Sequence, residues 1–384
     1  MPETESLDEK WSNDLRSGFV SILGRPNAGK STLLNSLVGE KVAIVTSKPQ
    51  TTRNRITGVL EVAAIKGRRE AAQIVFVDTP GVHKPGTQLD RRMMQAVHEA
   101  LEDRDIVMLV VDASREVRLA EEAVAEVVEG EAVVPAEKPL HRKLDWRSED
   151  EFVFGLIEKL DCPVFLVINK IDLVRREELL PLIEKLRGRH AFAGVFPISA
   201  RKRDGLDALV DGLVEKLPVG ERYFPPEQYT DQPERFLVAE LIRERILMET
   251  GEEVPYASAV VVERFEEPEA VETPKVKKPR MLKGGIPAPV TLPLTRIGAV
   301  IYCERDGQKA ILIGRAGEKL KAIGTSARRE IESLLGTRVY LELQVIVEPE
   351  WRERKGFIDG LDWRRQLEEM GAKQGDEGSE GTRE

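Results

Sequence analysis

The sequence is poor in cysteine and aromatic residues, and it lacks long apolar runs. Its 384 residues include two cysteines, and 5% of them are aromatic. Cys162 and Cys303 both lie in apolar segments, which excludes a disulfide-rich secreted domain and predicts two buried reduced thiols in a cytosolic protein. No apolar run approaches the roughly 18–20 residues of a membrane-spanning helix. The first residues, MPETESLDEKW, do not combine a basic start with an apolar stretch, so we predict no signal peptide.

The chain also lacks an excess of positive charge, since its formal net charge is −9. An acidic protein has no overall field that attracts nucleic acid, so any contact with RNA must come from local clusters of basic residues. A hydrophobic content of 41% is enough to build packed cores and argues against wholesale disorder. The length predicts two or three domains.

Short apolar runs alternate with helical patterns over the first part of the chain, residues 17–221. The runs are rich in valine and isoleucine and are bounded by turn residues: GFVSILG, QIVFVDT, DIVMLVVDA, PVFLVINK and GVFPISA. Strands that are apolar almost throughout are typical of a parallel sheet covered by helices on both faces. The pattern therefore predicts a doubly wound α/β domain.

A second pattern, from residue 233 to residue 350, has the order α-β-β-α-α-β and predicts a small α+β domain. It begins with the helical segment ERFLVAELIRERILMET and closes on the strand-like RVYLELQVIVE. The remaining segments are too polar, charged or proline-rich to belong to a core. We assign them as a tail at 1–16, a polar excursion at about 129–150, a linker at 222–232, a basic and proline-rich excursion at about 266–293, and a tail at 351–384.

The stretch GRPNAGKST, from Gly24 to Thr32, contains the phosphate-loop pattern GxxxxGK[ST] between a predicted strand and a predicted helix. Its glycines let backbone N–H groups surround a phosphate, Lys30 supplies positive charge, and the Ser31 hydroxyl is a ligand for Mg²⁺. The strand-loop-helix context makes a plain glycine-rich turn a poor alternative. The pattern predicts a nucleoside triphosphate but does not select the base.

The base is indicated by NKID, from Asn169 to Asp172, at the end of an apolar strand. The Asp172 carboxylate can accept both the N1–H and the exocyclic amine of guanine, a donor pair that adenine does not present. We expect Asn169 to fix the loop around the base and the Lys170 stem to lie over the purine face. Taken alone, this short pattern fits a strand end and a polar turn equally well.

Two further strand ends support guanine, namely DTPG from Asp78 to Gly81 and ISA ending at Ala200. Asp78 can contact Mg²⁺ through water, the Gly81 amide can sense a γ-phosphate, and a backbone amide near Ala200 can meet guanine O6. In this order the motifs predict GTP. The candidate nucleotide-binding residues are Gly24, Arg25, Pro26, Asn27, Ala28, Gly29, Lys30, Ser31, Thr32, Asp78, Thr79, Pro80, Gly81, Asn169, Lys170, Asp172, Ser199 and Ala200.

With these motifs, the chain resembles the Era family of bacterial GTPases, in the TrmE–Era branch of phosphate-loop GTPases. The resemblance covers about residues 17–350, with gaps at the two excursions. Its matching segments are GRPNAGKSTLLN, KPQTTRNRITGV, DTPGVHKP, NKID and ISA. These segments are specific in combination, so the resemblance implies a GTPase domain followed by an RNA-binding domain.

The resemblance also implies that GTP is hydrolysed to GDP with the help of metal ions. Mg²⁺ would be held by Ser31, Thr52 and Asp78. A potassium ion that bridges the phosphates is associated with Asn27 and would lie near Thr46 and Thr51. An Asn27 that only stabilises the loop is the alternative. The candidate catalytic residues are Lys30, Thr52, Asp78 and Gly81.

Val82 follows DTPG, at the position where many regulatory GTPases have a glutamine that orients the attacking water. An apolar side chain cannot do this, so the water must be positioned by backbone, by a second residue or by another molecule, and we expect slow intrinsic hydrolysis. His83 is interpreted as an incidental, solvent-facing residue rather than a general base. The polar stretch VTSKPQTTRNRITG fits a switch that orders on the γ-phosphate, with a plain surface loop as the alternative.

In the second domain, LIGRAGEKLKAIG contains Gly-Arg-Ala-Gly within an apolar frame. In KH domains such a GxxG loop joins two helices and lets a nucleic-acid backbone approach closely. The frame and the element order match the type II KH domain of Era proteins, although family members often have lysine and glycine where this chain has Arg315 and Ala316. The candidate RNA-binding residues are Lys309, Gly314, Arg315, Ala316, Gly317, Lys319, Lys321 and Arg328. A solvated helix face is the alternative interpretation of the basic residues.

The resemblance implies a target that residue spacing does not show, namely the single-stranded 3′ end of 16S rRNA and the 30S ribosomal subunit during its assembly. It also implies a cytoplasmic monomer with a weak peripheral contact at the inner face of the cell membrane. The basic run at 275–283 could contact RNA or anionic lipid, or it could be a soluble linker.

Two other functions stay open from the sequence. One is a GTPase that serves a tRNA-modification or membrane complex, against which the KH-like domain argues. The other is an RNA-binding scaffold whose nucleotide domain is structural. The intact Lys30, Ser31, Thr52 and Asp78 argue against that second alternative.

Overall fold

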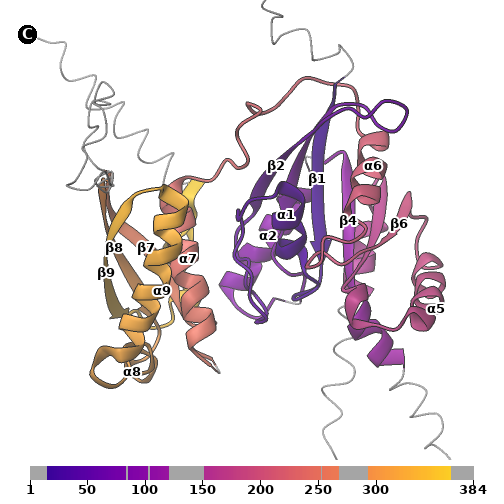
Figure 1. Ribbon diagram of the computed structural model, residues 1–384. Helices are drawn as coiled ribbons and strands as arrows, with labels where there is room; N and C mark the ends of the chain where they lie inside the picture. The colour runs from indigo at the N-terminus through magenta and orange to yellow at the C-terminus, as the bar shows by residue number, and fades with distance from the viewer. Residues whose placement is uncertain are drawn as a thin grey trace, which may run out of the picture. The chain divides into compact units, whose positions relative to one another are not determined.

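The computed structural model describes residues 15–83, 85–102, 104–120, 151–251, 253–267 and 293–364. The predicted excursion at 129–150, nearly all of the excursion at 266–293, and most of the predicted N-terminal tail lie outside the described residues. The chain divides into two compact units, Met1–Gln232 and Pro233–Glu384 (Figure 1).

A six-stranded sheet forms the centre of the first unit, with the strand order β2-β3-β1-β4-β5-β6. Its strands are β1 (Arg16–Gly24), β2 (Ile56–Val62), β3 (Ala72–Asp78), β4 (Ile106–Asp112), β5 (Val164–Asn169) and β6 (Gly194–Pro197). All strands except β2 run parallel to their neighbours. The five predicted runs form the parallel strands β1, β3, β4, β5 and β6, as expected, whereas the edge strand β2, which was not among those runs, is antiparallel to β3. The reason is the short connection at 63–71, which can only reverse the chain direction, because parallel neighbours need a longer crossover.

Helices cover both faces of this sheet, which confirms the doubly wound α/β fold (Figure 1). One face carries α1 (Lys30–Val38) and α6 (Leu206–Lys216). The other face carries α2 (Gln88–Glu102), α5 (Arg176–Arg187) and the helical residues 113–120 and 151–157.

Alternate residues of the central strands face opposite helix layers, because side chains of a strand point to its two sides in turn. In β4, Met108 and Val110 pack toward α1 and α6, whereas Val107 and Leu109 pack toward α2 and α5. All four side chains are buried, and each contributes about 1.5–3 kcal/mol relative to an exposed position. The near-continuous apolar runs of the sequence thus serve two cores.

The second unit is a three-stranded sheet with three helices packed against it, in the predicted order α-β-β-α-α-β. Its elements are α7 (Glu234–Glu249), β7 (Ala259–Glu266), β8 (Leu294–Cys303), α8 (Asp306–Ile313), α9 (Glu318–Leu335) and β9 (Arg338–Val347). Strand β8 lies in the middle, antiparallel to β7 and parallel to β9. Apolar side chains of α7 and α9 form the core with the sheet, among them Ile242 and Ile323.

Residues 351–364 depart from the sequence analysis, which assigns 351–384 to a tail. They form a 3₁₀ turn (Trp351–Glu353) and the short helix α10 (Lys355–Gly360). Trp351 is fully buried, and its indole N–H donates to the Ala257 carbonyl at 2.8 Å. Trp363 is buried as well. The two tryptophans are isolated in a charged stretch, so composition alone suggested a tail, yet their apolar area holds this segment on the second unit.

The segment assigned as a linker, 222–232, follows the outer side of β2 in the first unit. The Val59 N–H donates to the Tyr229 carbonyl at 2.9 Å, and the Thr230 hydroxyl donates to the Thr57 carbonyl at 2.8 Å. These contacts pair the segment with an edge strand whose outward-facing backbone groups would otherwise meet only water. The linker therefore has a defined path up to the end of the first unit.

Both cysteines are free thiols in the structure. Cys303 is buried in β8, whereas Cys162 is half-buried near the start of β5. The prediction of a buried thiol is therefore correct for Cys303 and wrong for Cys162.

Candidate functional site

The motifs from the first part of the sequence meet at one edge of the six-stranded sheet. Strand β1 ends at Gly24, β3 ends at Asp78 and β5 ends at Asn169, while Ser199 and Ala200 follow β6. The carboxyl ends of parallel strands share one edge, and in open α/β sheets ligands bind in the crevice outside this edge. Segments far apart in the sequence therefore surround one site.

The phosphate loop runs from the end of β1 to the start of α1 at Lys30. Gly29 has a left-handed backbone with φ of 92°, and a Cβ added there would lie 2.3 Å from Nδ2 of Asn169. Only glycine satisfies both constraints without a rearrangement of the loop. An anion above this loop would meet the amide groups at the N-terminus of α1.

Lys30 and Asp78 are opposite charges buried in the same site. The Lys30 ammonium donates to the carbonyls of Gly24 and Arg25, each at 3.1 Å. Burial lowers the pKa of Lys30 to about 8, although the Asp78 charge raises it. Burial likewise raises the pKa of Asp78 to about 6, against the Lys30 charge and the hydrogen bonds from neighbouring hydroxyls. The site thus disfavours its own charges, and a bound phosphate with a cation would compensate them.

Ser31, Thr52 and Asp78 form a cluster of oxygen atoms beside Lys30. The Ser31 hydroxyl donates to Oδ2 of Asp78 at 2.6 Å and lies 2.8 Å from the Thr52 hydroxyl. The second carboxylate oxygen of Asp78 is buried and has no hydrogen-bond partner among the described residues. One carboxylate with two hydroxyls is a donor set that suits Mg²⁺, which is bound through few protein ligands together with phosphates and water. The residues present therefore fit this ion.

The segment 46–52 lies over the phosphate loop. Asn27 donates from its amide to the Ser47 carbonyl at 2.9 Å, and the hydroxyls of Thr46 and Thr51 are 2.7 Å apart. The structure thus brings together the three residues that the resemblance associates with potassium, Asn27, Thr46 and Thr51. In this arrangement Asn27 also ties the phosphate loop to the segment above it.

Asn169 connects the phosphate loop to both segments expected to read the base. Its amide nitrogen donates to the Ala28 carbonyl at 2.9 Å, and its amide oxygen accepts from the backbone N–H groups of Lys170 and Ala200 at 2.8 and 3.0 Å. The side chain is buried and all of these partners are backbone groups. Asn169 therefore fixes the positions of three loops, as the sequence analysis expects of it.

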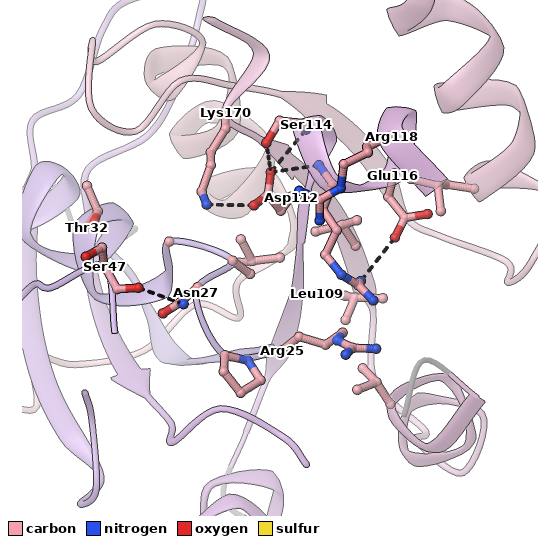
Figure 2. Close-up of a pocket in the computed structure, with 18 of the residues that line it drawn as sticks. Arg25, Asn27, Thr32, Ser47, Leu109, Asp112, Ser114, Glu116, Arg118 and Lys170 are labelled. Atoms are coloured by element: carbon pink, nitrogen blue, oxygen red, sulfur yellow. Dashed lines mark hydrogen bonds and ion pairs between the residues drawn. The ribbon is translucent and has the colours of Figure 1, made fainter. Parts of the chain in front are cut away.

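Asp172 and Lys170 are held by partners that lie far away in the sequence. The Ser199 hydroxyl donates to the Asp172 carboxylate at 2.7 Å. The Lys170 ammonium is 2.6 Å from Oδ2 of Asp112, the last residue of β4, and Figure 2 shows the two side chains directed at each other. The sequence analysis did not single out Asp112. The feature that could have indicated Asp112 is its position as a carboxylate at the end of an apolar strand, in VVDA, at the same sheet edge.

A cavity of about 480 Å³ borders the phosphate loop, and it is large enough for part of a nucleotide (Figure 2). Its wall includes the predicted residues Arg25, Pro26, Asn27, Ala28, Gly29, Thr32 and Lys170. It also includes Asp112 and Phe154, which the sequence analysis missed. Asp172 and Ser199, which are predicted to read the base, do not belong to its wall.

DTPG places Gly81 against the phosphate loop. A Cβ at Gly81 would lie 2.7 Å from atoms of Pro26, so this close approach requires glycine. Thr79 donates to the Ile22 carbonyl at 2.8 Å, which anchors the turn to β1. Val82 is fully buried in the core on the α2 side and does not face the phosphate loop.

His83 differs from its interpretation as a solvent-facing residue. Its side chain is 14% exposed, its Nδ1 lies 2.9 Å from the Gly81 carbonyl, and its Nε2 lies 3.0 Å from Oδ1 of Asp90. Local sequence could not reveal this, because the burial depends on the packing of α2 and of the segment around Gln50.

The GxxG loop in the second unit lies between α8 and α9, as predicted. Gly314 and Gly317 have φ of 72° and 80°, and Ala316 has φ of 50°, a left-handed conformation that alanine adopts at a cost. Glycine at this position would relieve the strain. Arg315 and Ala316 are exposed at the tip of the loop.

The basic candidates of the second unit lie on the two helices that this loop joins. Lys309 is on α8, and Lys319, Lys321 and Arg328 are on α9. Lys321 and Arg328 are exposed, while Lys309 and Lys319 are half-exposed. The arrangement can meet phosphates with its cations and a backbone with its glycines.

Each of the two units matches a known protein family. Residues 19–170 match the family described as 50S ribosome-binding GTPase, and residues 292–352 match the KH domain family. The chain is 44% identical to the GTPase Era of Syntrophus aciditrophicus over 88% of its length and 91% of that protein. The GTPase Era of Heliobacterium modesticaldum is 42% identical over 92% and 99% of the two chains. The chain belongs to the Era family of GTPases.

Solved structures of Era proteins have the same fold. A variant of Aquifex aeolicus Era bound to GDP and AlF4⁻ matches with a TM-score of 0.71 and 34% identity, covering 89% of this chain and 97% of that one. An Era in complex with MgGDPNP and nucleotides 1506–1542 of 16S ribosomal RNA matches with a TM-score of 0.71 and 36% identity, covering 90% and 97%. This Era family member is therefore a GTPase with a C-terminal KH domain, as the sequence analysis concludes.

Proposed function

We propose that this Era family GTPase is a GTP-dependent switch that binds 16S rRNA near its 3′ end and assists assembly of the 30S subunit in the cytoplasm. The observation that carries the proposal is the presence, in one chain, of a guanine-nucleotide site and a GxxG loop with exposed cations. The Era of the solved complex contains MgGDPNP and a 16S fragment together, which supports the same pairing of ligands here.

In the first unit, the phosphate loop and Lys30 hold the phosphates, and Asp172 with Ser199 and Ala200 reads guanine. Ser31, Thr52 and Asp78 hold Mg²⁺, which supplies charge neutralisation for phosphoryl transfer. Gly81 donates its backbone N–H to the γ-phosphate, so the segment after β3 depends on the nucleotide. The open oxygen of Asp78 and the clustered hydroxyls support this assignment.

Asn27, Thr46 and Thr51 would hold a potassium ion, which would supply a second positive charge at the phosphates. The proximity of the three side chains supports this site, and so does the hydrogen bond from Asn27 to the Ser47 carbonyl, which joins the phosphate loop to the segment 46–52. Catalysis then rests on charge neutralisation and gives a slow intrinsic rate.

In the second unit, the 16S 3′ end lies along the GxxG loop, with Arg315, Lys319 and Lys321 on its phosphates. GTP favours the arrangement of the chain that binds RNA, and hydrolysis releases it. Thermodynamic reciprocity requires that RNA raise the affinity for GTP by the same factor.

The remaining proposals concern the oligomeric state and contact with a membrane. We propose a monomer, and a weak contact with the inner face of the cell membrane stays a prediction of the resemblance. Among the residues that the structure describes, no helix is long and apolar enough to cross a membrane. The basic run at 275–283 lies outside the described residues.

The test is GTP turnover in potassium buffer with and without an oligonucleotide that carries the 16S 3′ end, with a scrambled strand as control. We expect acceleration by the cognate strand alone. A second measurement compares binding to purified 30S and 50S subunits. The family that matches the first unit is described as 50S ribosome-binding GTPase, whereas we propose binding to the 30S subunit. Equal binding to cognate and scrambled strands, or preference for 50S, would refute the proposed target.

A further inference from the structure

GTP hydrolysis in this chain needs a group that orients the attacking water, and Val82 is not that group. Its side chain is fully buried in the core on the α2 side. A cavity of about 50 Å³ lies between the phosphate loop and the segment 44–52, and Lys30, Ser31 and Gly81 form part of its wall. Any side chain that orients water beside the γ-phosphate must reach this space.

Two amide side chains line this cavity, Asn27 and Gln50. Asn27 directs its amide nitrogen to the Ser47 carbonyl and so closes the loop. Gln50 has a left-handed backbone with φ of 58°, which is uncommon for a residue other than glycine, asparagine or aspartate. Strained backbone conformations of this kind persist where the surroundings enforce them, and they concentrate at functional sites.

The side chain of Gln50 is held by the segment that follows Gly81. Its Nε2 lies 3.2 Å from Oδ1 of Asp90 and 3.2 Å from Nε2 of His83. A carboxylate only accepts hydrogen bonds, so the amide nitrogen must be the atom that faces Asp90. The amide oxygen, which takes no hydrogen bond from the described residues, is left as the atom available to water.

Asp90 is itself a fixed anchor at the first turn of α2. Its other oxygen accepts from the backbone N–H groups of Gly86 and Thr87 at 3.0 and 2.9 Å, and from the Thr87 hydroxyl at 2.9 Å. Burial raises the pKa of Asp90, but the hydrogen bonds from His83, Thr87 and Gly86 outweigh it and leave the pKa well below its usual range. The acceptor that holds Gln50 is therefore an ionised carboxylate with little freedom to move.

We propose that Gln50 orients the attacking water in GTP hydrolysis, with Asp90 and His83 as the residues that position it. This rests on the placement of the γ-phosphate over Lys30, Ser31 and Gly81 in the proposed function. Gln50 belongs to the segment before β2, so this glutamine comes from a different segment of the chain than the position after DTPG.

The chemical step uses Gln50 without changing it. The water oxygen forms a bond to the γ-phosphorus while the bond from that phosphorus to the β–γ bridging oxygen breaks, and GDP leaves with the electron pair. The proton of the water passes to a phosphate oxygen. The amide oxygen of Gln50 accepts a hydrogen bond from the water and fixes its line of approach, and it takes no proton.

The experiment compares Gln50→Met, which keeps the bulk, with Gln50→Gly, which relieves the left-handed strain. Pro49→Ala changes the exposed neighbouring residue and is the matched control. Steady-state hydrolysis at saturating GTP gives kcat, and a non-hydrolysable GTP analogue gives binding affinity separately. A lost hydrogen bond to a group in a charged transition state predicts that both Gln50 variants lose about ten- to a hundredfold in kcat. Analogue affinity stays within about twofold, because the interaction is made only with the reacting water.

The alternative is that Gln50 only joins the segment before β2 to the start of α2 and does not orient water, and this alternative predicts a different result. In that case Gln50→Met and Gln50→Gly weaken analogue binding as much as they slow hydrolysis, and that result overturns the proposal. Unchanged kcat in either variant also overturns it. His83→Ala, which removes the neighbouring donor that fixes Asp90 beside Gln50, is expected to give an intermediate loss in kcat with unchanged affinity.

Lys30→Ala separates this inference from the proposed function. If that variant binds the analogue as tightly as the unaltered protein, the placement of the γ-phosphate is wrong and the assignment of Gln50 falls with it. If Lys30→Ala loses binding while the Gln50 variants retain full kcat, the nucleotide site stands and Gln50 is not the water-orienting residue.

Discussion

The nucleotide site and the GxxG loop differ in how far their polar side chains are buried. Lys30 is 6% exposed, Asp78 is fully buried and Asn169 is 2% exposed. In the second unit Arg315 and Lys321 are exposed. The first site is a set of prearranged, mutually bonded groups, whereas the second is a surface whose cations remain in water.

This difference reflects the two kinds of ligand. A nucleotide is one small molecule of fixed shape, so buried groups can be arranged around it, and each buried group left unpaired is costly. An RNA backbone is flexible and repeats one charge, so exposed cations contribute separately and through release of counterions. We therefore expect single substitutions to be severe and specific in the first unit, and mild and additive in the second.

The largest effect is expected for Lys30→Ala. Loss of the buried cation that we propose to bond the phosphates should weaken GTP binding by about a hundredfold or more, since each hydrogen bond to a charged group contributes about 1.5–3 kcal/mol. Fluorescence titration with a labelled GTP analogue measures the change. Lys216→Ala, at an exposed position of α6, is the control and should bind normally. Similar affinities for the two variants would mean that the first site is as tolerant as the second.

Asp172→Asn sharpens the comparison by testing specificity. The variant keeps one acceptor oxygen but replaces the other with an NH2 group, so it can no longer accept from both guanine donors, and we expect about ten- to a hundredfold weaker GTP binding. The new amide can donate to the 2-oxo group of xanthine, so binding of XTP should improve. Competition between GTP and XTP measures both changes. An equal loss for the two nucleotides would show a collapsed loop rather than a changed base preference.

The proposed potassium site predicts a smaller effect. Turnover of GTP should be about tenfold faster in potassium than in sodium at matched ionic strength, which corresponds to roughly 1.4 kcal/mol of the barrier. Asn27→Ala should remove this difference. Equal rates in the two salts would leave Asn27 with the loop-closing hydrogen bond to Ser47 as its role.

The smallest effect is expected on the exposed surface of the second unit. Arg315→Ala should weaken binding of the 16S 3′ strand several-fold and lower the slope of log affinity against log salt by about 1, as expected for one lost phosphate contact. Arg315→Lys should retain the slope, and Arg187→Ala, on α5, should change nothing. A loss of a hundredfold in Arg315→Ala would mean that this loop is as prearranged as the nucleotide site.

The sequence predicted the parts of the molecule that depend on local spacing. The phosphate loop, NKID and the GxxG frame each need residues at fixed short distances, because one turn or one helix start determines their geometry. The two-sided apolar strands likewise require a sheet with helices on both faces. The sequence did not predict the direction of β2, because a strand pattern specifies its faces and not its orientation.

Contacts between distant segments also escaped prediction. Gln50 and His83 are far apart in the sequence, and neither carries a local signal that their side chains meet. Asp112 is one of several carboxylates at strand ends, and only the position of Lys170 distinguishes it. Trp351 is a single apolar residue in a charged stretch, so its burial follows from a fitting surface on the second unit.

The contact between residues 229–230 and the edge strand β2 has a consequence for the behaviour of the isolated first unit. An uncovered edge strand presents a row of backbone donors and acceptors that can pair with another chain. In the intact protein the Val59 N–H is taken by Tyr229, and the Thr57 carbonyl by Thr230. A fragment that ends at residue 221 would expose this edge and be prone to aggregation, whereas one that ends at residue 232 would carry its own protective cover.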